Sequence, residues 1–321
     1  PIEGTAIMAD ADILYPQDII AIDSGFLIDD YHDPFFLQYY KNRNDTNPQY
    51  LAPKGSGPDE FINTVNLYYN PRTRKLFIYD SQLKRITTYN VNNNQIATDS
   101  LSTDKINIIH VNGDDTMPLR SDFVTNGVFS GRPFARISHD GATFSDFGTF
   151  PVDSAEIKDP ISFNLIFQSL IIFNPKGTRM VSASRFCDWL AFYDMEVESP
   201  TLVKEYYSYA PKATSRQSDV NTTSLVKDPE CMNTYTCLSS TDNYMYALYS
   251  GRTQREIDDN IFRPRYILKF NWDGELVDGF RVDENVYRFS VTNDDSRMLG
   301  LVYLGEDAGE NNIVIKEYRL N

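Results

Sequence analysis

Three short elements place an arginine after a serine at corresponding points along the chain. They are Ser130-Gly131-Arg132, Ser184-Arg185 and Ser250-Gly251-Arg252. A guanidinium group binds carboxylates through paired hydrogen bonds, whereas aromatic rings suit sugars and apolar groups. Four further residues of suitable types lie near these arginines: Asp188, Trp189, Arg255 and Tyr266. The pattern predicts a binding face for a small acidic or carbohydrate ligand or a protein segment.

Acidic residues occupy the corresponding points elsewhere in the chain. The acidic side of the predicted face starts at turns near Asp29, Asp80 and Glu306 and also includes Asp30, His32 and Asp33. The competing interpretation is that all these side chains are ordinary solvated turn residues. Asp80 also precedes Arg85 by a four-residue turn, which predicts a local ion pair between them.

Two other functions stay open. A hydrolase of the lactonase-like kind would bind one divalent metal through oxygen ligands, for which Asp30, Asp80 and Asp188 are candidates. A scaffold would dock a partner protein on the long loops at 206–230 and 251–263. No Ser/His/Asp or Cys/His arrangement can be assembled from the sequence, so we expect no cofactor and favour binding over catalysis.

An internal repeat organises the elements that position these residues. The segment from Thr64 to Leu101 predicts four short strands separated by turns rich in Pro, Asn, Ser and Lys. Its first turn, at Asn70, has five counterparts, at Ser24, Asp122, Asn174, Thr241 and Asn293, so the turn occurs six times. Since one four-stranded sheet cannot bury both its faces, stacked repeats are required. We therefore predict an all-β, six-bladed propeller with four-stranded antiparallel blades.

The predicted domain is the whole chain, 1–321. Its blades are expected near 15–53, 64–101, 106–150, 161–206, 231–282 and 286–321. The last blade has only three strand segments before the chain stops, so residues 1–14 are expected to supply its fourth strand and close the ring. The excess residues 206–230 predict an inserted loop.

The net charge of −15 comes from 30 basic and 45 acidic residues. Such a surface disfavours nucleic acid and anionic lipid as partners. No apolar run is long enough to span a membrane. The chain starts at Pro1 without an initiator Met, so we expect a preceding export signal, which could carry a lipid anchor. The cysteines, Cys187, Cys231 and Cys237, form no disulfide framework, and Cys231 and Cys237 could pair only across a turn.

One stretch carries a family resemblance. LFIYDSQLKRITTYN, preceded by KGSGPDEF, resembles the NHL-type propeller repeat, in which a Gly-rich turn ends in Phe before an apolar strand and Asp. Here the glycines would let the chain cross between blades while Phe61 fills the junction. The whole chain resembles the TolB-like six-bladed propellers of Gram-negative bacteria. The resemblance implies export to the periplasm or cell surface, often as a lipoprotein, and identifies no ligand.

Overall fold

The computed structural model describes most of the chain. The described residues are 1–7, 13–64, 66–92, 95–96, 106–107, 116–119, 122–138, 144–152, 160–197, 199–217, 223–261, 263, 265–305 and 312–320. The chain divides into two compact units. The first comprises 1–110, 239–242 and 280–321, and the second comprises 111–238 and 243–279. The prediction of one domain over 1–321 stays a prediction.

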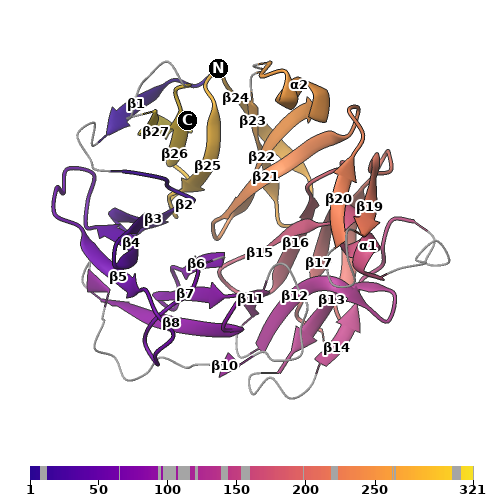
Figure 1. Ribbon diagram of the computed structural model, residues 1–321, viewed down its shortest axis with the longest axis horizontal. Coiled ribbons are helices and arrows are strands. Elements are labelled where there is room, and N and C mark those ends of the chain that lie inside the picture. The colour runs from indigo at the N-terminus through magenta and orange to yellow at the C-terminus, as the bar shows by residue number, and fades with distance from the viewer. Residues whose placement is uncertain are drawn as a thin grey trace. The chain divides into compact units, whose positions relative to one another are not determined.

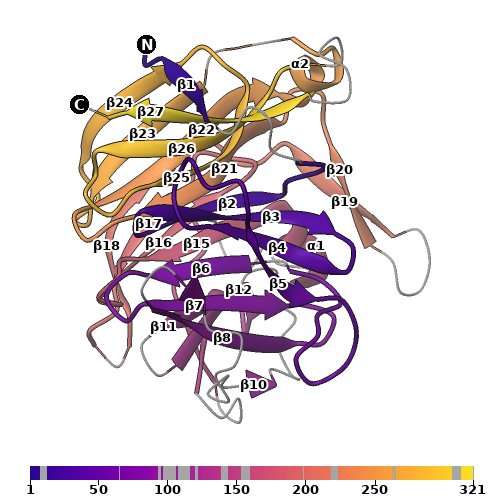
Figure 2. The same cartoon turned by 90° about the vertical axis from the view of Figure 1, so that its left-hand side faces the viewer.

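The described strands form six antiparallel sheets of the predicted kind. The first contains β2 (Asp18–Ile22), β3 (Gly25–His32), β4 (Phe35–Tyr40) and β5 (Gln49–Pro53), in that order. Figure 2 shows these strands side by side. The second contains β6 (Asn66–Asn70), β7 (Lys75–Asp80), β8 (Arg85–Asn92) and β10 (Ile106–Asn107), with the short β9 (Gln95–Ile96) also paired to β8.

Three further sheets follow the same order of strands. The third contains β11 (Thr116–Leu119), β12 (Asp122–Phe129), β13 (Arg132–Ile137) and β14 (Phe144–Phe147). The fourth contains β15 (Ser169–Phe173), β16 (Arg179–Ser184), β17 (Leu190–Asp194) and β18 (Thr201–Tyr206). The fifth contains β21 (Met232–Ser240), β22 (Tyr244–Thr253), β23 (Arg265–Asn271) and β24 (Leu276–Val282).

The last sheet contains both ends of the chain. Its strands are β25 (Val286–Val291), β26 (Arg297–Tyr303), β27 (Ile313–Arg319) and β1 (Gly4–Ile7). β1 pairs antiparallel with β27, with Gly4 opposite Tyr318 and Ile7 opposite Ile315. Figure 1 shows the N-terminal strand beside the C-terminal one. The predicted closure by an N-terminal strand is confirmed.

Stacking of sheets explains why single strands are buried on both faces. In the first unit, Leu27 and Leu37 pack with Leu76 and Ile78 of the second sheet. On its other face, Ile28 packs with residues of the last sheet, including Leu299, Leu301 and Ile315. β3 is consequently buried from Gly25 to Asp30, because neighbouring sheets cover both rows of its alternating side chains.

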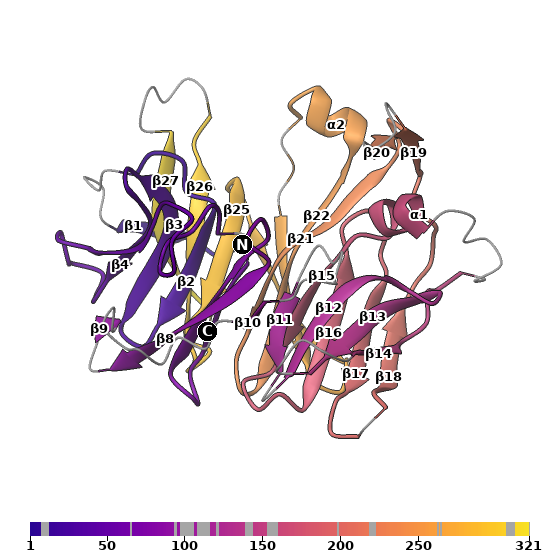
Figure 3. The same ribbon diagram turned by 60° about the horizontal axis from the view of Figure 1, so that its bottom comes forward.

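The segment predicted as an inserted loop contains a β-hairpin that the sequence pattern did not predict. Its strands are β19 (Ala213–Gln217) and β20 (Thr223–Lys227), paired in register from Ala213–Lys227 to Gln217–Thr223. Figure 3 shows the hairpin beside helix α1 (Pro160–Ile166). The hydroxyl of Ser215 donates to that of Ser162 on α1. A second short helix, α2 (Gln254–Asp258), begins with a capping box at Thr253.

Candidate functional site

A cavity of about 440 Å³ lies in the first unit, between its first and last sheets. The β2–β3 turn, the segment after β4, the β25–β26 turn, β26 and β27 form its walls. The lining residues are Asp23, Ser24, Gly25, Phe26, Asn42, Arg43, Asn44, Thr292, Arg297, Leu299 and Glu317. A volume in this range suits a small organic ligand.

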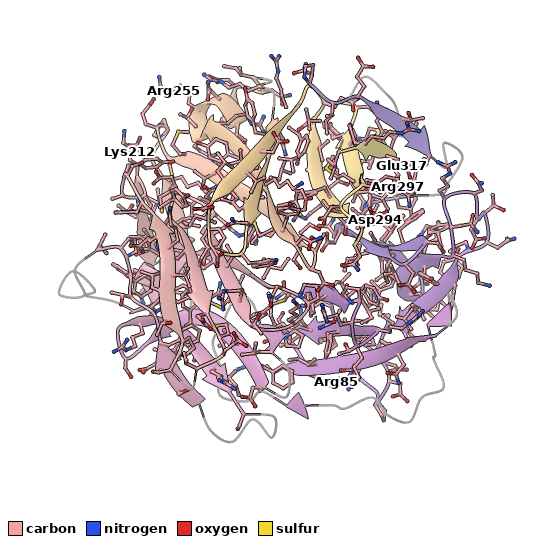
Figure 4. All side chains as sticks on the ribbon, turned by 180° about the vertical axis from the view of Figure 1, so that it is seen from behind. Arg85, Lys212, Arg255, Asp294, Arg297 and Glu317 are labelled. Atoms are coloured by element: carbon pink, nitrogen blue, oxygen red, sulfur yellow. The ribbon has the colours of Figure 1, made fainter. Side chains whose placement is uncertain are left out.

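Glu317 on β27 lies between two arginines that line this cavity. Its Oε1 is 3.3 Å from Nη1 of Arg43, and its Oε2 is 3.1 Å from Nη1 of Arg297. The side chain of Glu317 is only 14% exposed, against 57% for Arg43 and 39% for Arg297. Figure 4 shows Arg297, Glu317 and Asp294 together at the strands of the last sheet. The carboxylate is therefore enclosed, whereas both guanidinium groups reach solvent.

The β25–β26 turn holds Arg297 at the cavity. The Thr292 hydroxyl donates to Oδ1 of Asp294 at 2.6 Å, and the backbone N–H of Arg297 donates to the same hydroxyl at 3.2 Å. The hydrogen bond from Thr292, followed by those from Ser296 and the charge of Arg297, lowers the pKa of Asp294. Asp294 is therefore ionised at neutral pH and contributes to balancing the charge of Arg297.

The floor of the cavity is apolar. Phe26 and Leu299 are buried there, and the ring of Phe26 stacks on Tyr40 with centroids 5.1 Å apart. Gly25 must be glycine, because a Cβ at this position would lie 2.1 Å from the backbone oxygen of Tyr40. The acidic wall residue Asp23 is already paired, with Nη2 of Arg74 at 2.7 Å from its Oδ2.

The two arginines keep hydrogen-bond donors for a ligand. Arg43 and Arg297 each donate one N–H to Glu317, and neither side chain makes another hydrogen bond or ion pair within the described residues. A guanidinium group carries five N–H donors. Donors beside an apolar floor can hold a small molecule that combines an anionic group with an apolar body.

The predicted acidic residues of the first unit lie elsewhere. Asp30 is fully buried and accepts hydrogen bonds from the backbone N–H groups of Leu14 and Tyr15, at 2.9 and 2.7 Å. His32 lies beside it and accepts from the amide of Gln38 at 2.9 Å. Asp30 therefore anchors the segment that precedes β2.

Asp80 plays the same part in the second sheet. It is fully buried and accepts from four backbone N–H groups, those of Ile62, Asn63, Gln82 and Leu83. The predicted Asp80–Arg85 ion pair is wrong. Arg85 instead donates to the carbonyl oxygens of Gly57, Pro58 and Glu60. Four backbone N–H groups thus bond to the aspartate, and three carbonyl oxygens accept from the two Nη atoms of the arginine, so both side chains hold backbone segments in place.

The predicted arginines of the second unit also contact protein groups. Arg132 donates to the carbonyl oxygen of Gly148 at 3.1 Å and lies 3.7 Å from Asp146. Arg252 donates to the carbonyl oxygen of Ile261 at 3.4 Å, and partial burial lowers its pKa. For the two remaining arginines, the backbone N–H of Arg185 donates to Gln168, and Arg255 pairs with Glu230 at 2.8 Å.

The last two predicted residues adjoin each other in the second unit. Asp188 accepts from the backbone N–H and hydroxyl of Ser208. Trp189 is fully buried, and its Nε1 donates to Glu205 at 2.8 Å. Its ring also contacts Phe150, with ring centroids 5.9 Å apart. Ligand binding at the residues of the predicted face stays a prediction, and Glu306 lies outside the described residues.

The cavity lies at the opposite end of the strands from the predicted acidic side. β3 runs from Gly25 at the cavity to His32, a distance of about 23 Å for seven strand residues. The repeat located the turns at Ser24 and Asn293, which flank the cavity. No sequence signal, however, pairs Arg43 with Glu317, because only contact between the first and last sheets brings them together.

A family model described as TolB-like 6-blade propeller-like matches residues 3–294. The chain belongs to this TolB-like family. The predicted fold class is thereby confirmed, and the six sheets, mainly four-stranded, are the blades of a TolB-like propeller. A search of the curated proteins found no match.

Solved structures share this fold at low identity. One is a protein of Bacteroides fragilis whose name assigns it to the exported proteins, with 11% identity, a TM-score of 0.55 and coverage of 99% of this chain and 94% of that one. Another is a member of the DUF4221 family from Bacteroides vulgatus, with 10% identity, a TM-score of 0.56 and coverage of 99% and 98%. At these identities the likeness shows the fold of the TolB-like propeller alone.

Other predicted features have the following outcomes. All three cysteines are buried and none forms a disulfide, so no disulfide joins Cys231 and Cys237. Within the described residues, no three His, Cys, Asp or Glu side chains gather where they could hold a metal ion. Helices α1 and α2, of seven and five residues, are too short to cross a membrane.

Proposed function

We propose that this TolB-like propeller is an exported binding protein, and that it holds a small anionic ligand in the cavity between its first and last blades. The observation that carries the proposal is the pair of half-exposed guanidinium groups, Arg43 and Arg297, that share the enclosed carboxylate of Glu317 above an apolar floor. The name of the Bacteroides fragilis structure supports export. Fractionation of the source cells tests the export, and recovery of the protein in the cytoplasm would contradict export.

The charges favour an anionic ligand over a cation. The chain carries a net charge of −15, so exposed arginines with spare donors stand out against the rest of the surface. The one wall carboxylate besides Glu317 is Asp23, which Arg74 already neutralises. A ligand carboxylate would gain charge-assisted hydrogen bonds from Arg43 and Arg297, and its hydrocarbon part would cover Phe26 and Leu299.

Calorimetric titration at low ionic strength tests the proposal. Acetate, succinate, citrate, benzoate and inorganic phosphate are the probes, with glucose as a neutral comparison. We expect saturable binding of at least one acid. Arg43→Ala and Arg297→Ala should each weaken it about tenfold or more, because a hydrogen bond to a charged group contributes about 1.5–3 kcal/mol.

Arg179 provides a matched control. It follows the first turn of the fourth blade, as Arg297 does in the last blade, and its Nη1 lies 3.0 Å from Asp194. Arg179→Ala removes a similar ion pair far along the chain from the cavity residues and should leave binding unchanged. Equal losses in Arg179→Ala and Arg297→Ala, or no saturable heat with any acid, would contradict the proposal.

Glu317→Gln should strengthen acid binding, whereas the two arginine variants should weaken it. The glutamine removes the negative charge that competes for Arg43 and Arg297 while keeping a side chain of similar shape. We expect acid binding several-fold tighter than in the wild type. If the ion pairs were only structural, this variant would lose stability without any gain in affinity.

A further inference from the structure

Two arginines of the last blade stand directly opposite each other beside the cavity. Arg297 on β26 and Arg319 on β27 are partners in the antiparallel ladder. Their side chains therefore lie on the same face of the sheet, with Cβ atoms about 4.5–5.5 Å apart. The next pair on this face, Leu299 and Glu317, lines the cavity. Because like charges directly opposite each other destabilise a ladder, an anion bound at this pair would stabilise it.

Protein carboxylates satisfy this arginine pair only in part. Arg319 is exposed, and its side chain makes no hydrogen bond or ion pair within the described residues. Glu317 accepts from Arg297 through Oε2, but its Oε1 accepts from Arg43. Asp294 is engaged in its own turn, where it accepts from the Thr292 hydroxyl and the backbone N–H of Ser296. The arginine pair thus keeps donors for a further carboxylate.

The first blade contributes a second group of donors on the opposite wall. Arg43 lies between Asn42 and Asn44 in the segment after β4, and all three residues line the cavity. The backbone N–H of Asn44 donates to Oδ1 of Asn42 at 2.9 Å. The side-chain amide nitrogens of both asparagines make no hydrogen bond within the described residues. Since each amide nitrogen can donate twice, this wall can also hold a carboxylate.

Glu317 separates the two donor groups. Nη1 of Arg43 is 3.3 Å from one of its carboxylate oxygens and Nη1 of Arg297 is 3.1 Å from the other, so the two nitrogen atoms lie within about 9 Å of each other. Because Glu317 is enclosed and already occupies the position between them, one ligand carboxylate cannot bridge the arginines in the same way. A ligand therefore meets each guanidinium group from its solvent side, on either side of Glu317.

We infer that the cavity selects a small dicarboxylic acid, an inference that rests on the proposed function. One carboxylate lies against Arg297 and Arg319 of the last blade, and the other lies against Arg43 of the first blade. A saturated chain of about four to six carbon atoms reaches from one group to the other, with each carboxylate accepting charge-assisted hydrogen bonds. Its methylene groups cover Phe26 and Leu299 on the apolar floor. The ligand thereby joins the first blade to the last.

Calorimetric titration of the full chain with a series of diacids tests the inference. The probes are malonate, succinate, glutarate, adipate and suberate at one ionic strength, with acetate and inorganic phosphate for comparison. Monomethyl succinate is the matched probe, because it has the length of succinate and only one carboxylate. We expect affinity to be highest for succinate, glutarate or adipate and lower for malonate and suberate. The best diacid should bind at least about tenfold more tightly than the monoester, because its second carboxylate is also hydrogen-bonded to a guanidinium group.

Three variants assign the two ends of the ligand. Arg43→Ala should lower the affinity for the diacid to that for monomethyl succinate, because only one carboxylate remains bound. Arg319→Ala should weaken diacid binding several-fold without lowering the Tm, since it also removes the opposed like charges. Arg319→Glu places a carboxylate opposite Arg297, so it should raise the Tm and abolish the preference for diacids.

Arg281 provides a matched control in the same unit. Its Nε lies 2.7 Å from Asp283, and its side chain is 50% exposed. Arg281→Ala should leave the affinity for every acid unchanged. Circular dichroism and the Tm of each variant establish that it is folded.

The results separate this inference from the proposed function. If no acid binds, both fail. If acetate or monomethyl succinate binds as tightly as the best diacid, and Arg43→Ala and Arg297→Ala weaken that binding, the cavity holds anions but the preference for dicarboxylic acids is overturned. Tighter binding of inorganic phosphate than of any diacid would equally overturn it, as would unchanged diacid affinity in the folded Arg319→Ala variant.

Discussion

Asp80 and Arg85 are direct partners across the β7–β8 ladder, yet each side chain bonds to the backbone and not to the other. Asp80 accepts hydrogen bonds from four backbone N–H groups, two before its strand and two after it. Arg85 donates to three carbonyl oxygens of the segment 57–60. The guanidinium also lies 5.6 Å from the ring of Phe61, which is fully buried. The two residues fix the path of the chain from the first blade into the second.

Asp80→Asn is therefore expected to destabilise the protein by about 1–3 kcal/mol, because an amide oxygen replaces a carboxylate that satisfies several buried donors. Arg85→Lys should cost a similar amount, since an ammonium group cannot reproduce the planar fork. Urea unfolding measures the free energy of unfolding of both variants. Asp273→Asn, at an exposed turn, is the matched control and should change the free energy of unfolding little.

The buried carboxyl of Asp29 should make the free energy of unfolding depend on pH in an unusual direction for an aspartate. Burial raises its pKa to about 8, while the hydrogen bond from Thr64 lowers it and the charges of Asp18 and Asp30 raise it. The folded state thus binds a proton that the unfolded state releases above its ordinary pKa of 3.8. Stability from this group is present below that value and is lost as pH rises toward 8.

We therefore expect the free energy of unfolding to fall between pH 5 and 8, by at most about 1.4 kcal/mol for each pH unit from this group. Asp29→Asn should flatten the slope and stabilise the protein at pH 8. Denaturant unfolding at several pH values measures it, and an unchanged slope in Asp29→Asn would assign the dependence to other groups. Burial also raises the pKa of Asp18, so this carboxyl contributes with the same sign.

The cysteines should be inert in the folded protein. All three are buried, and burial raises the pKa of Cys187 to about 11. Because the thiolate is the reactive form, Ellman's reagent should label essentially none of them at pH 8. In guanidinium chloride under reducing conditions it should label all three. Rapid labelling of the native protein would show that the segment around Cys187 and Cys231 opens readily.

Deletion of residues 1–7 should lower the Tm and promote aggregation. The deletion removes β1 and leaves the outer edge of β27 unpaired, and an open strand edge pairs with other chains. Hydrogen exchange along β27 should increase in the truncated protein, and light scattering should rise on heating. An unchanged Tm would mean that β1 adds little to the last blade.

The sequence predicted the fold because blades are local. Turn residues predict the hairpins, and so do apolar strands such as KLFIYD, in which Leu76 and Ile78 are buried. The three strand segments predicted for the last blade are β25, β26 and β27. The β19–β20 hairpin was missed because its strands are polar and half-exposed, so they lack the apolar alternation that predicts a strand.

The candidate site was harder to predict. Asp30 and Asp80 have the residue types and positions of ligand-binding groups, but sequence could not show that backbone N–H groups already occupy them. Arg43 and Glu317 lie at opposite ends of the chain, and nothing local links them.

The pairing of β1 with β27 also sets the order in which the protein can be completed. Gly4 pairs with Tyr318, so about 300 residues must be synthesised after β1 before the last blade has all its strands. Contacts so distant in sequence slow folding. If the chain crosses a membrane from its N-terminus, its first strand arrives long before its partner. The final blade would then form only after translocation ends, and β1 would be the strand that stays unpaired longest.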